Sequence, residues 1–87
     1  MASLAAMQRL ADREAKKLGV EPVTIRYAAR GVCRLRNARI LAHAHCSGHD
    51  PEFGMICVRH GMDDWRDTIK HEVAHFAPLL GQDLRAH

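Results

Sequence analysis

The stretch Asp67-Thr68-Ile69-Lys70-His71-Glu72-Val73-Ala74-His75-Phe76 contains the pattern His-Glu-x-x-His. Four residues are close to one turn of an α-helix, so His71 and His75 would lie on the same helical face. Two imidazoles placed in this way can bind one metal ion, and Glu72 can reach a water on that ion. Because imidazole suits zinc, we expect Zn²⁺ as the cofactor.

The residues around this pattern also predict a helix. One apolar stripe recurs at steps of three and four residues and consists of Trp65, Ile69, Val73, Phe76 and Leu80. Such a stripe can enter a core while the two histidines lie on another flank. We expect an N-cap at Asp63 or Asp64. Regular helix should end near Pro78, which has no amide hydrogen for the carbonyl of Ala74.

The chain before this helix predicts one more helix and three or four short strands. Amphipathic spacing predicts a helix over residues 3–18, with Gly19 as its stop. Alternating or apolar runs predict strands at residues 23–28, 32–36, 40–45 and 53–59. The expected fold class is α+β, with an N-terminal helix, a small twisted sheet and a C-terminal metal-binding helix. The 87 residues would form one small domain, in the size range where a bound metal helps stability.

The composition indicates which cellular compartment and which binding partners to expect. The formal net charge is +3, and positive charge is concentrated at Arg30, Arg34, Arg36 and Arg39. Such a stretch is compatible with a solvated strand face or with contact to DNA or an acidic partner. We expect no membrane partner, because no apolar run is long enough to cross a bilayer. Three cysteines without a Cys-x-x-Cys pair, and no apolar N-terminal leader, predict reduced thiols in a cytoplasmic protein.

The order of elements resembles the upper half of a zincin metallopeptidase domain. More narrowly, the chain resembles the SprT-like zinc metallopeptidases, which include DNA-repair proteases of the Spartan type. The resembling segments are residues 23–27, 31–35, 42–45, 54–58 and 67–76, which are spread over about two thirds of the chain, and only the last is specific. The resemblance implies hydrolysis of peptide bonds through a zinc-bound water, with Glu72 as general base. It also implies a peptide or protein substrate, association with DNA, and a cleft-side edge strand at residues 53–58.

The same resemblance implies a third zinc ligand some ten to fifteen residues after the second histidine. His87 lies twelve positions after His75 and is the expected ligand. The alternatives are His49, whose surroundings resemble the family's third-ligand segment, and Asp83. The glycine and aromatic that usually follow the third histidine are absent after His87, which favours an incomplete domain. Such a domain can dimerise to cover its missing wall.

Two other classes of function remain open from the sequence. One is a non-catalytic zinc-stabilised binding module or an inactive fragment of a SprT-like protease. The other is a basic DNA-binding domain in which the histidine pattern is accidental. The remaining histidines are better explained as structural: His43 and His45 as residues of a strand, and His60 as part of a surface loop. Cys46 can ligate a metal with His45 or His49, but the spacing alone does not indicate it.

We predict that His87→Ala weakens zinc affinity at least about tenfold, because it would remove a direct ligand. Loss of a residue that only hydrogen-bonds to a metal ligand already weakens metal affinity about tenfold or more. His49→Ala should leave the affinity unchanged in the same buffer. Titration of the metal-free variants with zinc checks this. The reverse result would assign the third position to His49, from a permuted site or from a neighbouring chain.

Overall fold

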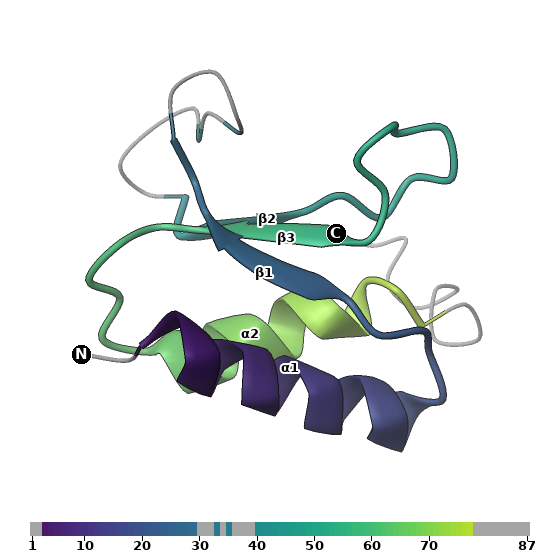
Figure 1. The fold of residues 1–87 in the computed structure, drawn as a ribbon, viewed down its shortest axis with the longest axis horizontal. Coiled ribbons are helices and arrows are strands. Elements are labelled where there is room, and N and C mark those ends of the chain that lie inside the picture. The colour runs from purple at the N-terminus through teal and green to yellow at the C-terminus, as the bar shows by residue number, and fades with distance from the viewer. Residues whose placement is uncertain (1–2, 30–32, 34, 36–39, 78–87) are drawn as a thin grey trace.

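The computed structural model describes residues 3–29, 33, 35 and 40–77 (Figure 1). Its elements are, in order, α1 (Leu4–Leu18), β1 (Thr24–Tyr27), β2 (Ala42–Ala44), β3 (Met55–Val58) and α2 (Trp65–Ala74). These confirm both predicted helices and three of the four predicted strands. Most of the fourth, residues 32–36, lies outside the described residues, although Cys33 forms an isolated antiparallel bridge with Ala29. The fold class is thus α+β, with two helices and one three-stranded mixed sheet.

The strand order is β1-β3-β2, with β1 parallel and β2 antiparallel to β3. This order corrects the prediction that residues 53–58 form the edge strand beside the cleft. Met55–Val58 is the central strand, and β2 is the edge strand instead. The physical reason is burial: Ile56, Cys57 and Val58 are each 0% exposed, which a strand achieves most readily with a neighbour on both sides.

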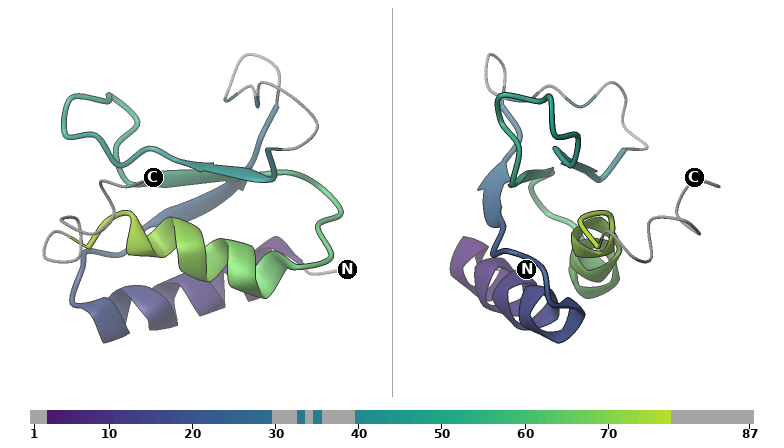
Figure 2. Two further views of the ribbon diagram at one scale, coloured as in Figure 1. Left: turned by 180° about the vertical axis from the view of Figure 1, so that it is seen from behind. Right: turned by 90° about the vertical axis from the view of Figure 1, so that its right-hand side faces the viewer.

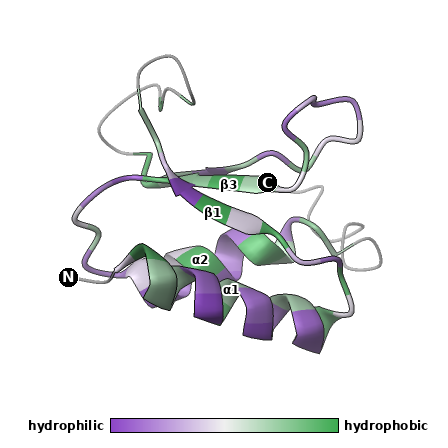
Figure 3. Ribbon diagram, in the orientation of Figure 1, coloured by the Kyte–Doolittle hydropathy of each residue, from purple (hydrophilic) through white to green (hydrophobic). Residues whose placement is uncertain are grey.

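Both helices pack on one face of the sheet (Figures 1 and 2). Figure 2, left, shows α2 beneath β2, whereas Figure 1 shows α1 beneath β1. The hydrophilic residues of α1 lie on its outward side (Figure 3). The core between the helices and the sheet is formed by Met7, Leu10, Ala11, Ala15, Val23, Ile25, Ile56, Val58, Met62, Ile69 and Val73.

Helix α1 has a well-defined start and stop. The Ser3 hydroxyl accepts a hydrogen bond from the amide of Ala6 at 3.1 Å, which caps the N-terminus. At the other end Gly19 takes the left-handed conformation, with φ of 72°, that closes a helix without strain in glycine. The side chain of Gln8 then joins α1 to β1: it donates to the carbonyl of Val23 at 2.7 Å and accepts from the amide of Ile25 at 2.8 Å.

Helix α2 confirms the predicted apolar stripe as far as it is described. Ile69 and Val73 are fully buried, and Trp65 and Phe76 are half-buried against the same core. Leu80 and Pro78 lie outside the described residues. The regular helix ends at Ala74, and the chain continues with tighter bonds such as Phe76 N–H to the carbonyl of Val73. In the described part of the chain, neither helix is long and apolar enough to cross a membrane.

We predict that Val73→Asp destabilises the protein by about 3 kcal/mol or more, because it buries a carboxylate without a partner in the core. The control is Ala5→Asp, which adds the same charge at an exposed position of α1 and should change stability by less than about 0.5 kcal/mol. Urea denaturation of both variants measures the difference. Equal midpoints for Val73→Asp and the wild type would contradict the described packing of α2.

Candidate metal centre

The histidine pattern occupies the last turn of α2, on the flank that does not enter the core. His71 is exposed, Glu72 is half-buried, and His75 is the C-cap residue with helical dihedral angles (φ −62°, ψ −19°). The helix was expected to continue through His75, but its last regular residue is Ala74. Because His75 keeps helical angles, its side chain still lies above that of His71.

The two imidazoles meet at their Nε2 atoms, which are 3.2 Å apart. The ring planes are nearly perpendicular, at 87°, with centroids 4.8 Å apart. Two nitrogens that each lie about 2.0–2.1 Å from a tetrahedral zinc ion are about 3.3 Å from each other. The described donor atoms therefore fit zinc without rearrangement of the helix.

Glu72 completes the group, since its carboxylate and the two histidine nitrogens all lie within 4.8 Å of one another. Burial raises the pKa of the Glu72 carboxyl to about 7, and a hydrogen bond from the backbone N–H of Ala44 acts in the opposite direction. A carboxyl group with a pKa near neutrality is suited to proton transfer at neutral pH. The two candidate metal ligands and a candidate general base are thus adjacent.

Helix α2 and the start of the edge strand β2 line a shallow, open hollow of about 350 Å³ beside this group. Its lining consists of Ile40, Leu41, Ala42, Asp67, Thr68, His71 and Glu72. A molecule in solution can therefore reach His71 and Glu72 through this hollow. The sequence did not reveal it, because the hollow depends on which strand lies at the edge above α2.

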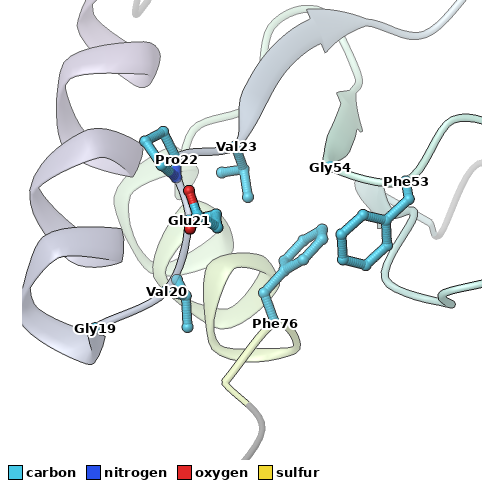
Figure 4. Close-up of a pocket in the computed structure, with 8 residues that line it drawn as sticks. All are labelled: Gly19, Val20, Glu21, Pro22, Val23, Phe53, Gly54 and Phe76. Carbon is cyan, nitrogen blue, oxygen red and sulfur yellow. The ribbon is translucent and has the colours of Figure 1, made fainter.

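A second hollow, of about 270 Å³, lies at the C-terminal end of α2 (Figure 4). It is mostly apolar, with Val20 and Val23 on one side and the rings of Phe53 and Phe76 on the other. The two rings meet edge to face with centroids 5.6 Å apart. No residue of the His-Glu-x-x-His pattern lines this second hollow, whereas His71 and Glu72 line the first. The first hollow is therefore the one beside the candidate metal ligands.

The predicted third ligands are not assembled with this group in the described residues. His87 and Asp83 lie outside that part of the chain. His49 is exposed in the loop between β2 and β3 and is not among the residues whose donor atoms gather around His71. The basic residues at positions 30, 34, 36 and 39 also lie outside the described residues.

A different cluster, which the sequence did not predict, forms on the opposite face of the sheet. Cys33, His45 and Cys57 place their donor atoms within 4.8 Å of one another, so they could bind a metal ion. The predicted role of His45 as a strand residue was too coarse, because its ring turns toward two thiols. Cys46 is exposed and not part of the cluster, and all three cysteines are free thiols.

Comparison with known proteins adds no family assignment: no protein-family model, curated protein or solved structure matches this chain.

We predict that the double variant His71→Ala/His75→Ala binds one zinc ion fewer per chain than the wild type, because it removes both imidazoles of the group. The double variant His43→Ala/His60→Ala, which removes two exposed histidines elsewhere, should bind as much zinc as the wild type. Metal analysis after dialysis against a zinc buffer measures the content. An unchanged content in the first variant would show that these histidines hold no metal.

Proposed function

We propose that this chain is a zinc-dependent metallopeptidase domain of zincin type, related to the SprT-like enzymes. The observation that favours this function is the position of His71, Glu72 and His75 beneath the open edge of β2, with a hollow between the helix and the strand. A metal site that served only to stabilise the fold would not need such access. The half-buried carboxylate adjacent to the imidazoles further favours catalysis over stabilisation alone.

The edge of β2 offers backbone groups to an extended peptide. Leu41 and His45 hydrogen-bond to β3, which leaves the backbone groups of Ala42 and Ala44 directed toward the open side of the strand. The N–H of Ala44 bonds to Glu72, so Ala42 is the position available for pairing. A peptide that adds to this edge as a strand would pass over the hollow and reach Glu72.

In this proposal each residue has a distinct task. His71 and His75 hold zinc together with a third protein ligand, for which His87 is the candidate. When bound, zinc supplies a Lewis acid that polarises the scissile carbonyl and makes a water molecule more acidic, with a pKa near 7 instead of about 15.7. Glu72 takes the proton of the attacking water at its carboxylate and delivers it to the leaving amine. The Ala44 amide orients that carboxylate.

The proposed partner of the site is a peptide or protein substrate. Association with DNA is a further part of the proposal and depends on the arginines at positions 30–39, and homodimerisation is one way to extend the cleft wall. The alternative, a non-catalytic zinc-stabilised module or an inactive protease fragment, shares the metal ligands but has no use for Glu72. Substitution of Glu72 therefore separates the two functions.

We predict that Glu72→Gln lowers the rate of peptide hydrolysis by about 10²- to 10⁴-fold, because an amide cannot accept the proton of the attacking water. The glutamine side chain has the same shape as glutamate, so the zinc content of the variant should equal that of the wild type. Turnover of quenched fluorescent peptides by the zinc-loaded chain, and its loss with a chelator, measures this.

The matched control is Glu21→Gln, which makes the same chemical change at an exposed residue between α1 and β1 and should leave turnover unchanged. Hydrolysis that persists in Glu72→Gln would show that Glu72 is not the general base. A zinc-loaded wild-type chain that cleaves none of the peptides would favour the non-catalytic module.

A further inference from the structure

The face of the sheet opposite the helices holds a group of sulfur and nitrogen donors in place of an apolar layer. Cys57 is 0% exposed on β3, Cys33 is 9% exposed after β1, and His45 is half-buried just after β2. Neither cysteine belongs to the core beneath the sheet. Both helices lie on the other side of the sheet (Figure 1), so neither of them covers this group.

The spacing of the donor atoms is that of three corners of a tetrahedral site. His45 Nε2 is 3.3 Å from Cys33 Sγ and 3.5 Å from Cys57 Sγ. Around a tetrahedral zinc ion, with Zn–S of about 2.3 Å and Zn–N of about 2.0–2.1 Å, sulfur and nitrogen ligands are about 3.5 Å apart. The two measured separations therefore match those of zinc ligands.

The imidazole of His45 is oriented as in a metal ligand. Its Nδ1 donates to Asp50 Oδ2 at 2.7 Å, which leaves the lone pair of Nε2 directed toward the two sulfurs. Asp50 is fixed in turn, because its Oδ1 accepts from the amide of Glu52 at 2.8 Å. A carboxylate that holds the second nitrogen of a ligating histidine is a recurrent feature of zinc sites.

One positively charged side chain beside the cluster suits a thiolate. Arg26 donates from Nε to Cys57 Sγ at 3.1 Å, and its guanidinium forms an ion pair with Glu52. The Glu52 carboxylate oxygen is 3.7 Å from His45 Nε2, so it lies beside the cluster. Two thiolates and one Zn²⁺ are neutral together, and the Arg26–Glu52 pair adds no net charge.

We propose that Cys33, His45 and Cys57 form a second, structural zinc site, with Glu52 or a water molecule at the fourth position. The three ligands come from the segment after β1, from the end of β2 and from the middle of β3. Zinc would therefore join these segments on the face that no helix covers. A chain of 87 residues gains much from such a link, because its apolar core is small. This site requires no catalytic activity and does not depend on the proposed peptidase function.

The test uses Co²⁺ as the probe, because cobalt bound to thiolates shows sulfur-to-metal charge-transfer absorption that histidine-bound cobalt lacks. The full chain carries His71→Ala and His75→Ala, so that only the second site is measured. It is purified with a reductant, stripped of metal and titrated with Co²⁺. We expect one equivalent to bind with a charge-transfer band, and Zn²⁺ to displace it.

Four further substitutions in this chain test the ligands and the partner of His45. Cys33→Ser and Cys57→Ser should each weaken the band strongly, and the double variant should abolish it, whereas Cys46→Ser, which replaces the exposed third thiol, should retain it in full. Asp50→Asn should keep the band but weaken affinity by about 10- to 100-fold, the usual effect of losing the partner of a ligating histidine. Circular dichroism establishes that each variant is folded.

Three results would overturn the proposal. The first is a folded parent chain that binds Co²⁺ without a charge-transfer band, a result that needs no cysteine variant. The second is a band of undiminished intensity in a folded Cys33→Ser or Cys57→Ser variant, or one that disappears in Cys46→Ser. The third is a Cys33–Cys57 disulfide in the isolated protein, with no metal uptake after reduction, which would assign these thiols to a covalent bond.

Discussion

The alternation of side chains along β3 determines the arrangement of this molecule. Ile56 and Val58 point into the core beneath the sheet, and Cys57, between them, points to the other face. A shift of one residue in the pairing would exchange the two sets, leaving the aliphatic side chains among polar groups. The position of α2 against the sheet and the meeting of Cys57 with His45 therefore depend on the same register.

The local features of this fold could be read from the sequence, but the neighbours of each strand could not. Ser3 and Gly19 mark the ends of α1, and the stripe around Ile69 and Val73 identifies the buried side of α2, because such signals act within a few residues. Strand order depends on contacts between distant segments. The apolar run at Ile56–Val58 was the available signal for a central strand, yet resemblance alone suggested an edge.

For the candidate site too, the local spacing was predicted from the sequence and the contacts between distant segments were not. One helical turn brings His71, Glu72 and His75 together, so their proximity follows from spacing. The hydrogen bond from Ala44 to Glu72 joins residues on different elements, and no local pattern indicates it. Cys33, His45 and Cys57 are also far apart in sequence and meet only because the strands pair in one register. Their short separations in space result from the sheet and not from a recognisable motif.

The side chain of Gln8 has a consequence for how this protein can associate. At the outer side of β1 its amide makes the two hydrogen bonds, to Val23 and Ile25, that an added strand would otherwise make. Two of the outward backbone groups at the β1 edge are thus already paired within the chain, whereas Ala42 on β2 can pair with an added strand. Pairing between copies through a single edge is self-complementary and stops at two chains. A polar residue in a helix thereby occupies part of the second sheet edge, which open-ended addition of strands would require.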